Sequence, residues 1–219
     1  MPPLTTAPSL SKIRQLQRPA TGSNNTPLQS PSIVETIHPL RSTWVIFFLH
    51  RPPGQKIQNF DGAMKRIGAF SSLEDFFGIY CHLRPISELP VISDYHLFRA
   101  GVKPTYEDPA NVNGGKWQIR LKKGLSTRIW ETLVLAIVGD QFSDMGDELC
   151  GAVMSARQNE DVLSIWNKTS GNGSINLKLR NSIRSILDIG DVAMEYISHN
   201  ERQSAPTPGG TTNHRKLHS

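Results

Sequence analysis

One eight-residue segment constrains the fold more than any other part of the chain. In KWQIRLKK, from Lys116 to Lys123, apolar and polar side chains alternate. Successive side chains of a β-strand point to opposite faces, so this pattern predicts a half-buried strand with one basic face. The basic face is either an ordinary solvated surface or, beside a ligand-binding loop, a surface that meets phosphates.

Other segments set the order of the elements. Ser71 and Glu74 match a capping box, which predicts that a helix begins there. A second helix is capped by Ser126 or Thr127 and runs to Val138, with Gly139 as its stop and one apolar stripe made of Ile129, Leu133, Ala136 and Ile137. A third helix continues from Ile175. Strands are predicted over 38–50, 64–69, 116–123, 150–157, 162–168 and 191–199. Strands follow one another in pairs, so we expect an α+β domain in which helices cover one face of an antiparallel sheet.

The length and composition predict one domain with flanking tails. The chain has 219 residues, of which 37% are hydrophobic. Residues 1–36 are rich in Ser, Thr, Pro, Asn and Gln and are expected to form a disordered N-terminal tail. Residues 37–199 are expected to form the domain, and residues 200–219 a mobile C-terminal segment.

Charge, cysteines and hydropathy narrow the classes of function. The formal net charge of +5 permits an acidic ligand without requiring one. Cys81 and Cys150 lie beside apolar segments without metal-ligand spacing, so we expect buried, reduced thiols and neither a disulfide framework nor a zinc site. Because the sequence carries no metal, P-loop or dinucleotide motif, we also expect no cofactor. The chain shows no apolar run long enough to cross a bilayer and no signal peptide. We therefore expect a protein of the cytoplasm, with access to the nucleus, that binds no membrane.

The loop from Gly101 to Trp117 carries the first candidate binding residues. Tyr106 stands beside Glu107 in a segment marked by prolines and a pair of glycines. A flat ring next to a carboxylate can stack on a nucleobase and read its edge, and a cationic base would fit best. The alternative is that Tyr106 packs in the core and Glu107 is a solvated charge.

The first predicted helix has an unusually aromatic stripe. Its apolar residues recur at steps of three and four: Leu73, Phe76, Phe77, Tyr80 and Leu83. This surface either packs in the core or forms a site for a partner protein.

Several motifs in the same order resemble the eukaryotic translation initiation factor 4E family, which binds the 5′ cap of messenger RNA. They are HPLRSTW, SLEDFFGIY, YEDPANVNGGKW, WETLVLAIVGDQF, CGAVMSAR and SIWNK. Within the family the chain is most similar to the 4E-homologous protein class. The resemblance implies a cupped antiparallel sheet that holds the cap on its concave side and three helices on its convex back.

The resemblance also implies roles for individual residues in cap binding. Phe60 and Tyr106 match the two rings that stack on 7-methylguanine, in a cation–π arrangement. Glu107 matches the carboxylate that accepts hydrogen bonds from the base edge, and Trp166 matches the ring that contacts the N7-methyl group. Arg157 matches an arginine that contacts the cap phosphates. The second basic phosphate position is Val162 here, and Arg120 and Lys122 could substitute for it.

The convex back of the family binds helical proteins that carry Tyr, four arbitrary residues, Leu and an apolar residue. The residues that match this groove are His38, Pro39, Leu73, Phe77 and Leu135. Phe77 stands where the family usually has Trp.

Three hypotheses for function follow from these residues. We expect a monomeric, non-enzymatic cap-binding protein that regulates translation initiation as a repressor or modulator and binds the cap more weakly than the main initiation factor. A second hypothesis is a protein-interaction scaffold with little cap binding. An enzyme that hydrolyses a cap or nucleotide is the third, and no paired carboxylates or metal-ligand cluster supports it.

Overall fold

The computed structural model describes residues 36–55 and 60–200. The predicted N-terminal tail and the predicted C-terminal segment lie outside the described residues, except for Thr36 and Asn200. From Ile37 onward the described residues form an α+β fold, which confirms the predicted class.

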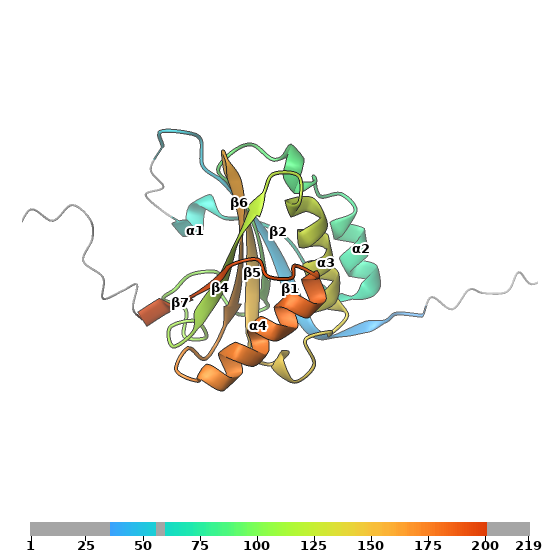
Figure 1. The fold of residues 1–219 in the computed structure, drawn as a ribbon. Coiled ribbons are helices and arrows are strands. Elements are labelled where there is room, and N and C mark those ends of the chain that lie inside the picture. Colours follow the sequence, from blue (N-terminus) through green and yellow to red (C-terminus); the bar gives the residue numbers. More distant parts are fainter. Residues whose placement is uncertain (1–35, 56–59, 201–219) are drawn as a thin grey trace, which may run out of the picture. The chain divides into compact units, whose positions relative to one another are not determined.

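The described part contains one open, curved sheet of seven strands in which every neighbouring pair is antiparallel (Figure 1). The strand order is β2-β1-β3-β5-β6-β4-β7. The strands are β1 (Pro39–His50), β2 (Lys65–Ser72), β3 (Ser93–Arg99), β4 (Gly115–Lys122), β5 (Leu149–Ala156), β6 (Glu160–Asn167) and β7 (Met194–Ser198).

Strand β3 is the one strand that the sequence patterns did not predict. Its residues SDYHLFR mix polar and apolar types without a clear period, yet all but Arg99 are buried. The strand lies between β1 and β5 in the middle of the sheet. Its burial therefore comes from its position rather than from its own hydrophobicity.

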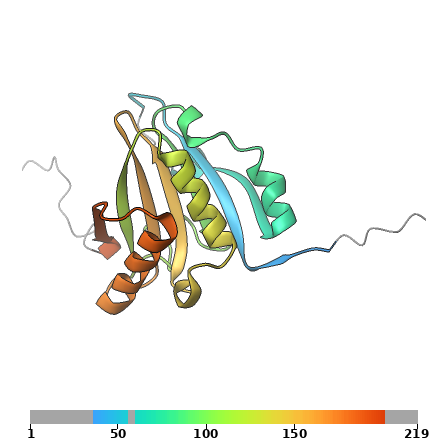
Figure 2. The ribbon, with the colours of Figure 1, turned by 45° about the vertical axis from the view of Figure 1, so that its right-hand side comes forward.

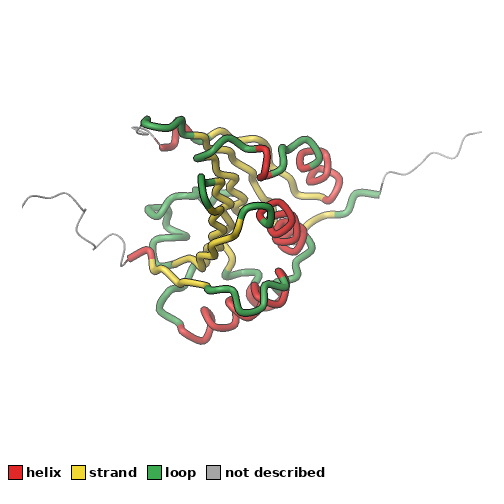
Figure 3. The backbone as a smooth tube through the Cα atoms, turned by 45° about the horizontal axis from the view of Figure 1, so that its top comes forward, coloured by secondary structure: helices red, strands yellow, loops and turns green. Residues whose placement is uncertain are grey.

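Three helices cover one face of the sheet, as the views in Figures 2 and 3 show. They are α2 (Leu73–Tyr80), α3 (Ser126–Val138) and α4 (Gly173–Leu187). The short helix α1 (Phe60–Ala63) lies on the other side of the strands (Figure 1). Two 3-10 turns, η1 (Ile86–Glu88) and η2 (Ser143–Met145), complete the described elements. The sheet thus keeps one face that these three helices leave uncovered.

Helix α3 supplies much of the core. Leu133 and Ile137 from the predicted stripe are buried, and Gly139 ends the helix as predicted. Trp130, which lies beside that stripe, is buried as well because the η1 turn packs against this side of the helix. Leu135 faces outward and is 40% exposed.

The helix starts differ from the predicted caps. Strand β2 continues to Ser72, so Ser72 rather than Ser71 is the last extended residue, and its hydroxyl accepts a hydrogen bond from the Asp75 N–H at 3.1 Å. Glu74 does not reach back to Ser71 and instead binds His38. At the start of α3, neither predicted cap residue serves the helix N-terminus, because Ser126 donates to Asp161 and Thr127 accepts from Ser87.

Candidate functional site

The side chains of β4 alternate between the two faces of the sheet and so show which residues lie on the open face. This strand buries three apolar side chains on the helix side: Trp117, Ile119 and Leu121. Arg120 points to the other face and is paired across the strands with Val162 of β6, while Lys116 is paired with Trp166. Directly paired residues of antiparallel strands share a face. All four of these side chains therefore belong to the concave face, which we call the cup.

Two rings that are distant in sequence meet in the cup. Tyr106 stacks on Trp166 with ring centroids 4.9 Å apart and an interplanar angle of 16°. His199 packs against both rings, with its centroid 4.9 Å from that of Tyr106 and 4.4 Å from that of Trp166. Trp166 is only 4% exposed, whereas Tyr106 is half-buried. The face-to-face contact of Tyr106 and Trp166 could not be read from sequence spacing.

The loop that carries Tyr106 is held by its own polar side chains. Asn111 donates to the backbone oxygens of Lys103 and Thr105, both at 2.8 Å. The Asp108 carboxylate accepts from the N–H groups of Lys103 and Ala110, both at 2.9 Å. These bonds fold the segment on itself, which fixes the backbone on both sides of Tyr106.

The glycine pair of the loop is required by close backbone contact. A Cβ atom on Gly114 would lie 2.0 Å from the backbone oxygen of Asn167, and one on Gly115 would lie 2.5 Å from Tyr196 Oη. Only glycine allows strand β4 to begin this close to β6 and β7. The pair thereby sets how the loop enters the cup.

The other two predicted base contacts are open to solvent. Glu107 is exposed beside Tyr106. Phe60 begins α1 and is 38% exposed, and among the described residues it makes no ring contact. The structure therefore brings Tyr106 and Trp166 together but does not join Phe60 to them.

Arg157 directly follows β5 and forms an ion pair with Asp94 of β3, with Nη2 2.8 Å from Oδ1. Its backbone N–H donates to the buried carboxylate of Asp161 at 3.1 Å. Burial is the largest single effect and would raise the pKa of Asp161, but the hydrogen bonds from Lys123, Ser126 and the Arg157 N–H, together with the charge of Lys123, lower that pKa overall. Asp94 was missed by the sequence analysis because it belongs to the unpredicted strand β3.

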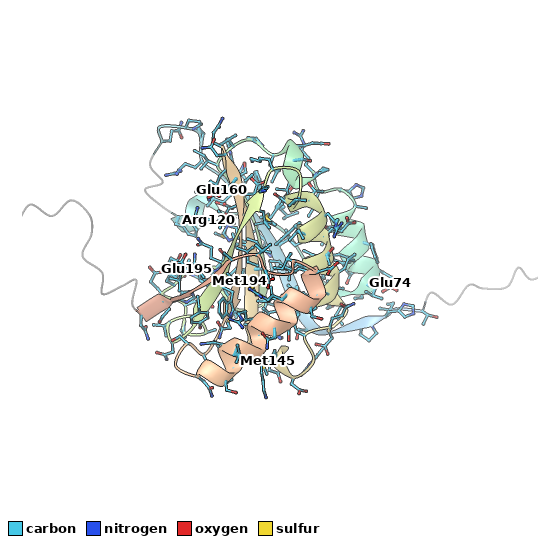
Figure 4. The ribbon with its side chains drawn as sticks, viewed as in Figure 1. Glu74, Arg120, Met145, Glu160, Met194 and Glu195 are labelled. Atoms are coloured by element: carbon cyan, nitrogen blue, oxygen red, sulfur yellow. The ribbon has the colours of Figure 1, made fainter. Side chains whose placement is uncertain are left out.

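The remaining predicted phosphate contacts lie on β4, which is separated from β5 by β6. Arg120 pairs with Glu160 in an exposed ion pair, and Lys122 is exposed on the same face of β4. Val162 occupies the position that matches the second basic phosphate contact of the family. Arg120 lies directly opposite Val162, so its guanidinium stands next to that position. Figure 4 shows Arg120 and Glu160 on the side of the sheet opposite to Glu74.

The five predicted partner residues lie on or beside the helix-covered back. Leu73 and Phe77 of α2 are 36% and 53% exposed, and Leu135 of α3 is 40% exposed. These are large apolar side chains outside the core. His38 and Pro39 precede and begin β1, whose first pairing, between Pro39 and Ser72, brings them to the start of α2.

A polar contact joins His38 to α2. Its Nδ1 lies 2.6 Å from Glu74 Oε1, and its backbone N–H donates to Oε2 at 3.1 Å. The side-chain bond from His38, followed by the backbone bond, lowers the pKa of Glu74 to about 2. In return, the Leu73 N–H donates to the His38 oxygen at 2.9 Å. The contact therefore ties β1 to the first turn of α2.

Within 36–55 and 60–200, no group of three or more His, Cys, Asp or Glu side chains could hold a metal ion. Both cysteines are free thiols, and Cys150 is buried as expected, but the prediction for Cys81 was wrong because this residue is exposed just past the end of α2. None of the described helices has the length and apolar character needed to cross a bilayer.

Comparison with known proteins decides the family. Eukaryotic initiation factor 4E, as a family, matches residues 39–213 of the chain. The chain belongs to the eukaryotic initiation factor 4E family. The matched span contains every predicted site residue except His38.

Individual members of the 4E family agree in sequence and structure. The translation initiation factor NCBP of Triticum aestivum is 47% identical over 164 residues, which are 74% of this chain and 70% of that protein. C. elegans eIF4E-3, solved in complex with the 4E-binding protein Mextli and cap analog, superposes with a TM-score of 0.72 at 33% identity, covering 78% of this chain and 98% of that one. Ascaris suum eIF4E-3, solved with m7G cap, superposes with a TM-score of 0.70 at 34% identity, covering 75% and 92%.

Proposed function

We propose that the chain binds the 7-methylguanosine 5′ cap of messenger RNA in the cup and thereby regulates translation initiation. The observation that carries this proposal is the meeting of Tyr106 and Trp166 on the open face of the sheet, with Glu107 exposed beside them. Two 4E relatives of this fold were solved with a cap or cap analog, which supports the same ligand here.

In the proposed complex, Phe60 and Tyr106 stack on the two faces of the methylated base. N7-methylation leaves a delocalised positive charge, so the rings attract the base by cation–π forces. Glu107 accepts hydrogen bonds from the base edge, and a charged acceptor strengthens each of them to about 1.5–3 kcal/mol. Trp166 contacts the methyl group once Tyr106 has moved off its face.

The cap phosphates are proposed to bind Arg157, with Arg120 and Lys122 as further contacts. A guanidinium can hold two phosphate oxygens at once, which favours Arg157 as the main contact. Both arginines already face a carboxylate in the cup. Phosphate binding therefore exchanges one anion for another rather than capturing a free cation.

The back surface is the proposed site for helical partner proteins with the Tyr-x4-Leu-apolar motif. Leu73, Phe77 and Leu135 supply exposed apolar area, and the contact between His38 and Glu74 holds the edge of the surface in shape. Partner and cap would bind on opposite sides of the sheet, so one molecule can hold both. We propose that residues 37–199 act as a monomeric cap-binding domain in the cytoplasm.

Phe60 and Tyr106 are smaller than the Trp rings usual in the family, so we propose weaker cap affinity than that of the main initiation factor. Such a protein would act as a class-2 repressor or modulator. Titration with 7-methyl-GTP and with GTP tests cap binding itself. The methylated ligand should bind more tightly, and Glu107→Ala should remove most of that binding without a change in melting temperature. Equal affinity for both nucleotides would contradict the proposal.

A second candidate function is a protein-interaction scaffold with little cap binding. It is favoured by the 4% exposure of Trp166, since a cup that stays closed by Tyr106 would hold no base. The same titration separates the two functions. A chain that binds a Tyr-x4-Leu-apolar peptide but not 7-methyl-GTP would be a scaffold.

A further inference from the structure

The aromatic cluster of the cup carries a cation of its own. Lys116 Nζ lies 5.7 Å from the ring centroid of Tyr106 and 5.8 Å from that of Trp166. It also donates to the Tyr106 hydroxyl oxygen at 3.3 Å. Both ring distances fall within the roughly 6 Å over which a cation is attracted to an aromatic face. One ammonium group therefore contacts both rings of the stacked pair.

Among the described residues, the contacts with Tyr106 and Trp166 are the main interactions that offset the cost of burying the Lys116 ammonium group. The residue is 7% exposed, and no carboxylate oxygen of the described residues lies within 4.0 Å of its Nζ. A buried charge is costly unless it is paired or hydrogen-bonded. Here the two rings and the Tyr106 hydroxyl stand in for a carboxylate, so the ammonium favours the arrangement in which Tyr106 stays near it.

The position of Lys116 follows from the sheet. Strand β4 lies between β6 and β7, and Lys116 is paired with Trp166 on one side and with Ile197 on the other. Its side chain is thereby directed onto the same face as Trp166. To move its ammonium group away from the two rings, Lys116 would have to change its side-chain rotamer although the residue is buried.

The closed arrangement opposes a cationic base in two ways. Tyr106 covers the face of Trp166, so a methyl group can reach the indole only after Tyr106 has moved. A positively charged base stacked on Tyr106 would also come close to the Lys116 ammonium, and like charges repel strongly where water is excluded. Ligand entry therefore requires both the ring and the ammonium to shift.

We propose that Lys116 is the gate of the cup: in the free protein it holds Tyr106 on Trp166, and it withdraws from the rings when the methylated base enters. The inference rests on the proposed function, because it assigns a further residue that controls access to the same site. Lys116 thus lowers the affinity of the cup for a cationic base that brings no negative charge of its own.

The test uses 7-methylguanosine, the nucleoside without phosphates, and three variants of the full chain. Lys116→Met keeps a side chain of similar length and removes the charge. Lys178→Met is the matched control, because Lys178 is exposed on α4 and touches neither ring. Tyr106→Phe keeps the ring and removes the hydroxyl that Lys116 binds, which gives a second test should Lys116→Met fail to fold.

Two measurements are made on each protein. NMR cross-relaxation between the ring protons of residue 106 and those of Trp166 is measured in the free proteins. It should weaken in Lys116→Met and, less strongly, in Tyr106→Phe, where the phenylalanine ring protons are observed. Affinity for 7-methylguanosine should rise roughly three- to tenfold in Lys116→Met relative to wild type and to Lys178→Met.

Either of two results would overturn the gate. One is that the ring contacts are undiminished in both variants. The other is that Lys116→Met folds and binds 7-methylguanosine no more tightly than wild type does. If no protein binds 7-methylguanosine or 7-methyl-GTP, wild type included, cap binding itself is wrong. The ring contacts in the free proteins then decide by themselves whether Lys116 holds Tyr106 in place.

Discussion

Arg157 has both a structural and a proposed ligand-binding role, and one pair of variants separates them. Its guanidinium lies 2.8 Å from Asp94 Oδ1, and the two charges attract by about 4 kcal/mol if the effective dielectric constant is about 20 and the charge centres are about 4 Å apart. The Arg157 side chain is 37% exposed and the contact is not an aligned hydrogen bond, so screening and desolvation reduce the net contribution to about 1–2 kcal/mol.

Arg157→Ala should therefore lower the melting temperature by about 2–8 °C, since about 1 kcal/mol corresponds to about 2–4 °C in a domain of this size. Part of the loss arises because Asp94 is left buried without its cation. Adding Asp94→Asn removes that charge and should restore most of the lost stability. Arg120→Ala is the comparison, because its ion pair with Glu160 is exposed on both sides and should change stability by under about 1 kcal/mol.

The same proteins are titrated with 7-methyl-GTP and with 7-methylguanosine at two salt concentrations. Loss of one charge-assisted contact, about 1.5–3 kcal/mol, should weaken 7-methyl-GTP binding by roughly ten- to 150-fold and flatten its salt dependence, with little change for the nucleoside. The double variant Arg157→Ala with Asp94→Asn should recover stability but not 7-methyl-GTP affinity. Equal losses for both ligands, or recovery of affinity together with stability, would refute a phosphate contact by Arg157.

Two further predictions concern the back of the sheet. Phe77→Ala should weaken binding of a Tyr-x4-Leu-apolar peptide at least about tenfold, and it should change the melting temperature little because the ring is 53% exposed. Leu177→Ala is the control, at a 49% exposed site on α4, and should leave peptide binding unchanged. Equal effects of the two substitutions on peptide binding would contradict the assigned surface. The pKa of Glu74 is lowered in the folded chain to about 2 by its bonds to His38, so this contact stabilises the fold above the ordinary pKa of 4.5 and is lost as pH falls towards 2. Melting curves of wild type and Glu74→Gln should accordingly differ at neutral pH and converge near pH 2; a difference that persists there would contradict the assignment.

Several features of the fold were predictable because they depend on periodicity alone. The alternation from Lys116 onward predicted which face of β4 is buried, and the structure buries Trp117, Ile119 and Leu121 on the helix side. The apolar stripe of α3 was predicted for the same reason, whereas its end at Gly139 was predicted from the preference for glycine after the last helical residue. Periodicity reports which side of an element is apolar, and in these elements that side is the one the sheet and helices bury.

Local hydrogen-bond signals were less reliable, because tertiary partners compete for the same groups. Ser126 looks like a helix cap in sequence, but the Asp161 carboxylate accepts from its hydroxyl in the folded chain. In the sequence Glu74 matches a capping box, but the pairing of β1 with β2 brings His38 to it, and the Glu74 carboxylate binds His38 instead. A short polar side chain takes the nearest strong partner, and distant strands determine which partner that is.

By itself, the sequence determined the family, the α+β class, and the residue types that a cup for a cationic base requires. The tertiary structure alone decided how those residues meet: Tyr106 on Trp166 rather than opposite Phe60, Arg157 on Asp94, and Lys116 over two rings. The physical reason is that side-chain contacts in a sheet depend on register between strands that are far apart in the chain, and β3, which carries Asp94, is recognisable as a strand only by its central position.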